Sequence, residues 1–231
     1  MRLMAHFSID RSTELEVRRA LPWRKRFGME VNMEQHIERA ASIRRTTKET
    51  DIRLSLVLDG SGKADIQTGI GFFDHMLEGF ARHGLFDLTV KVDGDLHVDG
   101  HHTVEDTGIV LGNAIAQAVG DKKGIGRYGH FLLPMDDALA LCAVDLCGRP
   151  YFAYDCDFPV PMIGTLDAQL IREFFYAVSY SAAMNLHIKM LSGINGHHMA
   201  EAMFKAFAKA LDMASRPDGR IEGVLSTKGS L

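Results

Sequence analysis

Two copies of the pattern His-His-x-x-Glu are the strongest candidates for chemistry in this sequence. They run from His101 to Glu105 and from His197 to Glu201. In a helix, residues i and i+4 share one face, whereas adjacent residues point about 100° apart. The first histidine and the glutamate of each copy are therefore predicted to bind one metal ion together. The second histidine of each copy, His102 or His198, is predicted to face elsewhere.

The ligand types of these two copies restrict the metal. Nitrogen and carboxylate ligands without thiolate suit manganese, iron, cobalt or zinc, and they favour octahedral over structural tetrahedral coordination. A single histidine pair at a helix start is more often a capping or surface feature, but its recurrence with glutamate at the same spacing favours a metal site. If the copies lie close together, each ion can take the His/Glu pair of one half and the second histidine of the other. The positive end of the helix dipole is also expected to disfavour imidazolium and keep the histidines neutral, as ligation requires.

The first copy is predicted to begin the last helix of a half-domain. Asp51–Asp59 alternates apolar and polar residues as a strand does, and the turn that follows it is expected to form a hairpin with Lys63–Gly69. A helix over Phe72–Arg82, a strand over Phe86–Val92 and a buried helix over Thr103–Val119 come next. The predicted order is strand, strand, helix, strand, helix.

The second half repeats this order. Its predicted elements are strands over Ala138–Leu146 and Tyr151–Tyr154, a helix over Leu166–Tyr180, a strand over Asn185–Met190 and a helix over His198–Ala214. Asp87–Val92 matches Asn185–Met190 at an offset of 98 (185 minus 87), and the His-His pairs match at 96 (197 minus 101). The fold class is therefore expected to be α+β, a two-layer α/β arrangement of duplicated ββαβα halves in which sheet packs against helices.

The predicted domain covers residues 44–231, with halves at about 44–123 and 124–231. The connecting stretch lacks linker composition, which favours one compact domain. Residues 1–43 are interpreted as an N-terminal extension without the features of a secretory signal or transit peptide. They form either a weakly ordered tail or an upstream start that precedes Met33.

Bulk composition excludes several classes of function. The 231 residues are 46% hydrophobic and 24% charged, which is ordinary for a globular protein. A net charge of −4 without a long basic run argues against a nucleic-acid partner, and no apolar run reaches the length of a membrane span. The three cysteines, Cys142, Cys147 and Cys156, lack Cys-x-x-Cys spacing and indicate buried thiols in a reducing compartment. A cytoplasmic location is expected.

A second group of polar residues could bind phosphate. Taken singly, each is an ordinary surface residue, but beside a metal pair they could form a clamp, because arginine offers forked donors and lysine a point charge. The candidates are Arg127, Arg149, Lys205, Ser226, Thr227 and Lys228.

Several ordered motifs resemble those of the imidazoleglycerol-phosphate dehydratase family. The resemblance covers about Arg44 to Gly229, and its motifs are Arg44–Thr50, Thr68–Leu77, Asp99–Asp106, Gly124–Gly129, Gly148–Pro150 and Gly196–Lys205. It implies a ribosomal protein S5 domain 2-like fold and removal of water from D-erythro-imidazole-glycerol phosphate, a small phosphorylated imidazole, in histidine biosynthesis. It also implies two manganese ions per active site, with zinc, iron or cobalt as substitutes. The sites would lie between subunits of a cage-like homo-oligomer of 24 chains.

The resemblance also implies roles for individual residues. The metal ligands would be His75, His101, His102, Glu105, His197, His198 and Glu201. Glu49 would contact substrate and move a proton, with Glu105 and Glu201 as the other catalytic carboxylates. His75 and His197 would meet substrate as well, and the clamp residues would hold its phosphate.

Glu173 is predicted to be a further ligand, although many relatives carry histidine there. At the offset of 98, His75 falls on Glu173 (173 minus 75), so the internal repeat places Glu173 where the first half has a family ligand. Carboxylate oxygen and imidazole nitrogen both suit a divalent ion of intermediate hardness. The alternative is a solvent-facing helical glutamate like its charged neighbour Arg172.

Two other functions fit the metal pattern. A dinuclear hydrolase of phosphate esters would use the same ligands to activate water. A metal-storing or purely structural cage protein would use them without catalysis. The products separate the three hypotheses: elimination gives a ketone phosphate, hydrolysis gives free phosphate, and storage gives neither.

Overall fold

The computed structural model describes residues 39–231, so most of the predicted extension lies outside the described residues. The elements of the first half are β1 (Ala40–Thr46), β2 (Thr50–Val57), β3 (Ala64–Gln67), α2 (Gly71–Gly84), β4 (Asp87–Gly94) and α3 (His101–Val119). Those of the second are β5 (Tyr128–Met135), β6 (Ala138–Asp145), β7 (Tyr151–Asp155), β8 (Met162–Ile163), β9 (Leu166–Asp167), α4 (Gln169–Ser181), β10 (Asn185–Ser192) and α5 (Gly196–Ser215). Strand β1 begins before residue 44, where the domain was expected to start.

Each half contains one four-stranded sheet with the same topology. The strand orders are β1-β2-β4-β3 and β5-β6-β10-β7. In both sheets the third strand in space is antiparallel to the second and parallel to the fourth. The α+β class and the internal duplication are confirmed.

The predicted hairpin between Asp51–Asp59 and Lys63–Gly69 is wrong. Strand β4 lies between β2 and β3, and β10 lies between β6 and β7, so β2 does not pair with β3 and β6 does not pair with β7. The reason is that α2 and α4 return the chain to the same sheet as crossover connections, which allow the next strand to insert in parallel. Alternation of apolar residues identifies a strand but not its partner.

The sequence pattern also missed two of the edge strands, β1 and β5. They pair antiparallel with β2 and β6, so each half begins with an additional strand. Strand β1 buries little beyond Ala41, and β5 contains Gly129 and Pro134. Weak alternation is typical of edge strands, where proline is also tolerated because one side of the strand needs no partner.

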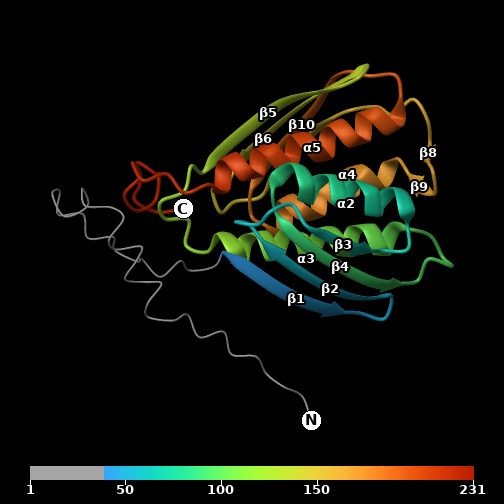
Figure 1. Cartoon of the computed structure of the whole chain (residues 1–231), viewed down its shortest axis with the longest axis horizontal. Helices are drawn as coiled ribbons and strands as arrows, with labels where there is room; N and C mark the ends of the chain where they lie inside the picture. The colour runs from blue at the N-terminus through green and yellow to red at the C-terminus, as the bar shows by residue number, and fades with distance from the viewer. Residues whose placement is uncertain (1–38) are drawn as a thin grey trace, which may run out of the picture. The chain divides into compact units, whose positions relative to one another are not determined.

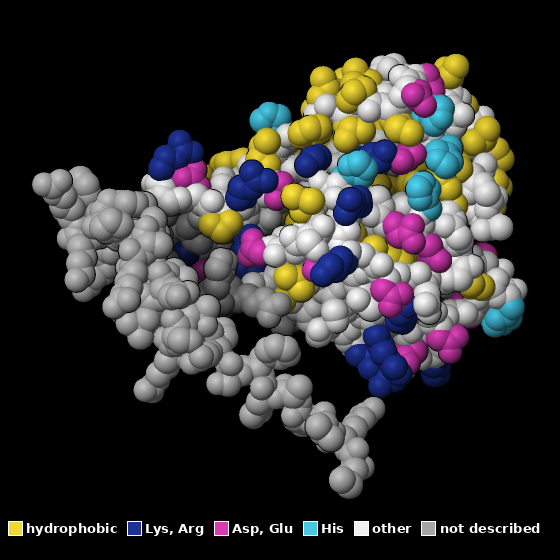
Figure 2. Space-filling model, viewed as in Figure 1, with side chains coloured by type: hydrophobic (Ala, Val, Ile, Leu, Met, Phe, Trp, Pro, Cys, Tyr) yellow, Lys and Arg dark blue, Asp and Glu magenta, His cyan; other side chains and the backbone are white. Residues whose placement is uncertain are grey.

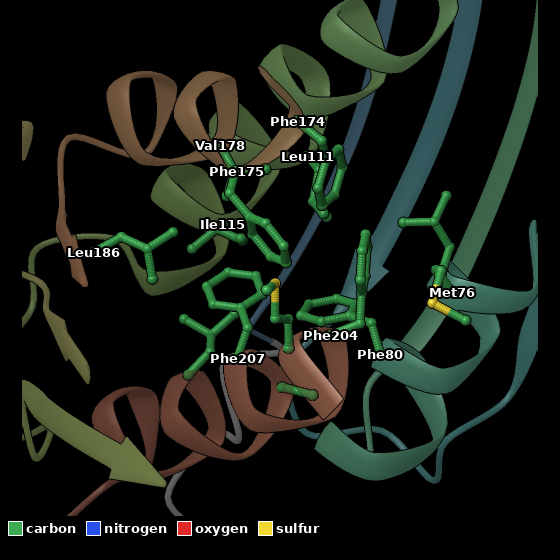
Figure 3. Packing of buried hydrophobic residues seen from close by; sticks show 14 of the residues in the cluster. Met76, Phe80, Leu111, Ile115, Phe174, Phe175, Val178, Leu186, Phe204 and Phe207 are labelled. Atoms are coloured by element: carbon green, nitrogen blue, oxygen red, sulfur yellow. The ribbon is translucent and has the colours of Figure 1, made fainter. Parts of the chain in front are cut away.

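Helices α2, α3, α4 and α5 lie between the two sheets (Figure 1). Helices α2 and α3 pack against the first sheet and α4 and α5 against the second, while α3 packs on α4 and α2 on α5. Five phenylalanines fill the space between the helices (Figure 3): Phe80, Phe174, Phe175, Phe204 and Phe207. Their stacked and edge-on contacts, such as 5.4 Å between the ring centroids of Phe80 and Phe207, add to the hydrophobic stabilisation of the interface.

Two glycines let α3 approach α4 closely. A Cβ on Gly108 would lie 2.7 Å from the Phe174 carbonyl oxygen, and one on Gly112 would lie 2.6 Å from the Val178 carbonyl oxygen. This close packing fixes the relative positions of α3 and α4. All four helices begin at the same end of the fold (Figure 1).

Within residues 39–231, no helix combines the length and the apolar character needed to cross a membrane.

Candidate metal centre and phosphate cavity

One cluster of three side chains joins the two halves. His75 on α2 meets His197 and Glu201 on α5, and one ligand atom from each lies within 4.8 Å of the others. His197 Nε2 is 3.3 Å from Glu201 Oε2, so the i and i+4 residues share a helix face as the spacing predicted. Both histidines are exposed and the glutamate is half-buried. Three protein ligands at an open surface leave further coordination positions for a ligand from outside the cluster.

Lys205 is the nearest charged neighbour of this cluster. Its Nζ lies 2.7 Å from Glu201 Oε1, and both side chains are largely shielded from solvent. Burial raises the pKa of Glu201, but the hydrogen bond and the charge of Lys205 outweigh this effect, so the pKa is lowered overall. The carboxylate is therefore ionised at neutral pH, as a ligand must be. In this chain Lys205 lies beside the His/Glu cluster and not with the other predicted clamp residues.

The second copy of the pattern lies on α3. His101 Nε2 is 3.6 Å from Glu105 Oε2, again on one helix face. Glu173 on α4 lines the same cavity of about 660 Å³ as His101. Its Oε1 accepts a hydrogen bond from Arg172 Nη1 at 2.9 Å, so the carboxylate is turned toward its neighbour. Within residues 39–231, only the cluster of His75, His197 and Glu201 brings three potential ligands within reach of one ion.

The second histidine of each copy contacts a carboxylate outside its own His/Glu pair, as predicted. His102 Nδ1 lies 3.0 Å from Asp95 Oδ2, and His198 Nδ1 lies 2.6 Å from Asp137 Oδ1. These hydrogen bonds raise the pKa of both histidines more than burial lowers it. The adjacent carboxylates therefore favour the protonated ring, in opposition to the effect that was expected of the helix dipole, because a carboxylate in contact with the ring is a stronger and closer charge than a helix end.

Glu49 lies in the β1–β2 turn, close to α3. Its Oε1 is 3.9 Å from His102 Nε2. Thr47 Oγ1 accepts hydrogen bonds from the backbone N–H groups of Glu49 and Thr50, which fixes the turn. The buried Thr50 hydroxyl donates to Asp106 on α3 at 2.5 Å. Glu49 is thus exposed but held on a rigid turn.

Arg45 and Asp106 are supporting residues that the sequence reasoning did not single out. Arg45 forms an ion pair with the buried Asp106 carboxylate, which ties β1 to the helix that carries His101 and His102. Arg45 does belong to the motif Arg44–Thr50, and that motif was the available signal. Its spatial partner lies 61 residues away (106 minus 45), a distance that no local pattern reveals.

A cavity of about 740 Å³ collects the remaining clamp residues. Arg127, Arg149, Ser226, Thr227 and Lys228 all line it, together with Arg220, which the sequence reasoning missed. Arg127 adopts a left-handed backbone conformation with φ 63°. Its guanidinium donates to Asp145 at 2.7 and 3.1 Å and to the Leu225 carbonyl oxygen at 2.7 Å. Arg127 therefore anchors the C-terminal segment that carries Ser226 and Lys228.

The charge of this cavity suits an anion. Four cationic side chains line it, from Arg127, Arg149, Arg220 and Lys228, and Glu222 is the acidic side chain in the lining. Arg127 is paired with Asp145 and Arg220 with Asp218, so Arg149 and Lys228 contribute most of the positive charge. Forked guanidinium donors match phosphate oxygens, and hydroxyl and backbone donors of the C-terminal segment could complete the contacts.

The metal cluster and the anion cavity lie at opposite ends of α5. The helix starts with the residues of the cluster and ends at Ser215, beside the segment that lines the cavity. Its 20 residues span about 30 Å at 1.5 Å per residue. Figure 1 places the C-terminus at the end opposite to the helix starts, and Figure 2 shows most of the visible histidine side chains near those starts. One small substrate cannot reach both sites of the same chain.

Comparison with a family model gives a match over residues 68–211, and the family is described as imidazoleglycerol-phosphate dehydratase. The matched region contains the metal cluster, the second His/Glu pair, Arg127 and Arg149.

Relatives and solved structures agree with the family match. The imidazoleglycerol-phosphate dehydratase of Lachnoclostridium phytofermentans is 65% identical over 195 residues, which are 84% of this chain and 100% of that protein. The enzyme of Acetivibrio thermocellus is 58% identical over the same shares. A crystal structure of the Staphylococcus aureus enzyme has a TM-score of 0.71 at 37% identity and covers 78% of this chain and 99% of that one. The structure from Pyrococcus furiosus also has a TM-score of 0.71, at 38% identity, and covers 82% of this chain and 100% of that one.

Proposed function

The chain belongs to the imidazoleglycerol-phosphate dehydratase family and is a hydro-lyase of histidine biosynthesis, and we propose that it dehydrates its substrate at a dinuclear metal site built from the cluster on α2 and α5 and the His101/Glu105 pair on α3. The reaction converts D-erythro-1-(imidazol-4-yl)glycerol 3-phosphate to 3-(imidazol-4-yl)-2-oxopropyl phosphate. The observation that carries the metal proposal is the convergence of His75 with His197 and Glu201 from different halves. The family match favours this function over the hydrolase and the storage protein.

The donor set fits manganese. Two imidazoles and an ionised carboxylate meet without a thiolate, a combination of intermediate and hard ligands that suits Mn²⁺ and also admits zinc, iron or cobalt. His101, Glu105 and Glu173 would hold the second ion, with His102 and His198 as ligands to ions shared with other subunits. Bound ions would supply Lewis acidity that favours the anionic form of the substrate's imidazole and the departure of hydroxide.

The chain's own residues would handle the proton. Dehydration breaks the C–O bond on the carbon next to the imidazole and the C–H bond on the following carbon, which leaves an enol that becomes the ketone. Glu49 is exposed on a fixed turn beside His102, so it can reach a substrate bound there and accept the proton from carbon. Glu105 and Glu201 would act as ligands that also orient the reacting groups.

Product analysis tests this function. Purified, manganese-loaded protein should convert imidazole-glycerol phosphate to the ketone phosphate, detected by its absorbance in alkali or by mass spectrometry, without release of inorganic phosphate. Phosphate release would instead support the hydrolase, and an unchanged substrate would support the storage protein.

We further propose that the active site is assembled between subunits of a homo-oligomer of 24 chains. The support is geometric: the metal cluster and the anion cavity of one chain are separated by the length of α5, so a bound substrate needs the cluster of one copy and the cavity of another. The open positions of the cluster could accept a histidine from a neighbouring chain.

Removal of metal is expected to loosen the oligomer as well as to stop turnover. Ligands that come from two chains convert metal-binding free energy into assembly free energy. Native mass spectrometry or light scattering before and after thorough chelation checks this, and added Mn²⁺ should restore the original mass. An oligomer of unchanged size in the metal-free protein would contradict shared sites.

The anion cavity is the proposed binding site for the substrate phosphate. Lys205 of a second chain, which lies beside the metal cluster of that chain, would also contact the phosphate. Arg149→Lys keeps the charge but loses the forked donors, so substrate binding should weaken roughly tenfold to hundredfold, the size expected for charge-assisted hydrogen bonds. Metal content should not change. KM and bound manganese measured together check this, and Lys123→Arg, a substitution in an exposed ion pair outside the cavity, is a matched control.

Glu173 is the proposed equivalent of His75 at the second ion. Glu173→Ala should lower manganese content and turnover, whereas Glu173→His should retain much of both, because imidazole is also an acceptable ligand. Arg172→Ala removes the hydrogen-bond partner of Glu173 and leaves the Glu173 carboxylate in place, so this variant should keep its manganese content. Wild-type metal stoichiometry and turnover in Glu173→Ala would assign Glu173 to the solvent-facing surface.

A cytoplasmic location is also proposed. Its support is that the three cysteines are free thiols, two of them buried, as expected in a reducing compartment.

A further inference from the structure

The turn before the second strand carries a carboxylate in both halves. Strands β1 and β2 pair with Thr46 opposite Asp51, and β5 and β6 pair with Pro134 opposite Leu139. Both pairs are related by the same offset of 88 (134 minus 46, 139 minus 51). At this offset Glu49 corresponds to Asp137, so the repeat places the two carboxylates at the same point of the fold.

These equivalent carboxylates have different surroundings. Asp137 Oδ2 accepts hydrogen bonds from the backbone N–H groups of Ile194, at 2.6 Å, and Asn195, at 3.0 Å. Its Oδ1 is 2.6 Å from His198 Nδ1. Glu49, in contrast, accepts no hydrogen bond from His102 Nδ1. That position is filled by Asp95, whose Oδ2 lies 3.0 Å from the ring nitrogen.

The contact with Asp137 selects one form of the histidine. An ionised carboxylate can only accept, so His198 Nδ1 must carry the proton and donate it to Asp137. The lone pair of the neutral ring then lies on Nε2, which points away from Asp137 toward the exposed Asp136, 3.5 Å away. A second carboxylate or carbonyl behind a metal-binding histidine commonly fixes its tautomer and ring orientation in this way.

We propose that Asp137 and Asp95 are positioning residues that hold His198 and His102 in the tautomer whose Nε2 can bind an ion. This inference rests on the proposed ligand roles of the two histidines. Because Asp95 orients His102 from the end of β4, Glu49 does not need to serve as the counterpart of Asp137 and is left free for substrate. The two halves have therefore diverged: the same turn position orients a ligand in the second half and moves a proton in the first.

The substitution Asp137→Asn distinguishes a positioning role of Asp137 from a purely structural role. The amide oxygen can still accept from the N–H groups of Ile194 and Asn195, which then turns the NH2 group toward His198 Nδ1. A donor at that place forces the proton onto Nε2 and blocks ligation. The opposite orientation of the amide would face two N–H donors with its own NH2 group and lose both hydrogen bonds.

The affinity and stoichiometry of Mn²⁺ binding to the full chain are measured by titration. The concentration of unbound Mn²⁺ is read from its electron paramagnetic resonance signal. Asp137→Asn should weaken binding at one ion by about 10-fold to 100-fold. The Asp137→Asn variant should bind Mn²⁺ at least as weakly as Asp137→Ala, in which the His198 ring can adopt either tautomer. A residue that only supported the loop would give the reverse order, because asparagine conserves the hydrogen bonds and alanine does not. That reverse order would overturn the proposal.

Three further variants complete the design. His198→Ala should lose the same ion, and if it binds manganese like the wild type, the ligand role of His198 fails and this proposal with it. If His198→Ala loses the ion but folded Asp137→Asn binds normally, only the positioning role is wrong. Asp95→Ala tests the first half independently and should also weaken one ion, whereas normal binding there would contradict the role of Asp95. Asp155→Asn, which removes an exposed carboxylate paired with Lys189, is the control and should bind manganese as the wild type does.

Discussion

Glu201→Gln is expected to lower turnover by a factor on the order of 10² to 10⁴, the size of a lost metal contribution of several kcal/mol. The glutamine is isosteric, but its amide is a weak ligand and its NH2 group would oppose the Lys205 ammonium, which now lies 2.7 Å from the carboxylate. The Glu201 side chain is only 13% exposed, so water cannot easily solvate the Lys205 ammonium once its carboxylate partner is lost. Bound manganese should fall together with kcat, while the fold is retained.

Turnover number, manganese content and circular dichroism of the same preparation check this expectation. Asp212→Asn is a matched control, because it removes a carboxylate from the same helix, where Asp212 pairs with Arg216 far from the cluster. It should have nearly wild-type turnover. Full manganese content and turnover in Glu201→Gln would rule out Glu201 as a ligand.

Gly129→Ala is expected to destabilise the fold by about 4 kcal/mol or more, the range reached only by severe changes in the core. Gly129 is buried on β5, which packs against α5. A Cβ at this position would lie 1.8 Å from the Ala210 carbonyl oxygen and 2.8 Å from the Ala214 backbone nitrogen. Both are backbone atoms of one helix, so relief of the clash requires α5 to move away from the sheet. The start of α5 carries His197 and Glu201, so metal binding should weaken as well.

The free energy of unfolding, measured with denaturant, checks the effect on stability. Gly79→Ala is the matched control within α2. A Cβ there meets no atom within 4 Å, so the substitution should be neutral or should stabilise the helix by up to about 1 kcal/mol. Equal stability of Gly129→Ala and wild type would mean that β5 and α5 are farther apart than the structure has them.

These expectations share one structural cause. Helix α5 carries His197 and Glu201 at its start, packs on both a sheet and α2 along its length, and ends beside the anion cavity. A change in its position therefore alters the metal cluster and the cavity together. This coupling explains why the close approach of β5 to α5 at Gly129 is expected to affect the metal cluster at the other end of the helix.

The sequence by itself determined the shared helix face of each His/Glu pair and the internal repeat. Helical spacing placed His197 and Glu201 on one face, and their side chains lie 3.3 Å apart. The offset between Asp87–Val92 and Asn185–Met190 identified the duplication, and the two sheets have the same strand order. Both features depend on residues that are close in sequence or related by a constant shift, so local periodicity and self-comparison are sufficient to find them.

Only the tertiary structure decided which strands pair and which residues meet across the chain. Strand alternation could not predict that β4 separates β2 from β3, because the pleat fixes the face of a side chain and not the neighbouring strand. His75 reaches the cluster, and Asp95 and Asp137 reach His102 and His198, through the packing of helices and loops. The separation of the metal cluster from the anion cavity by the length of α5 is likewise a property of the folded chain, because sequence distance carries no direction in space.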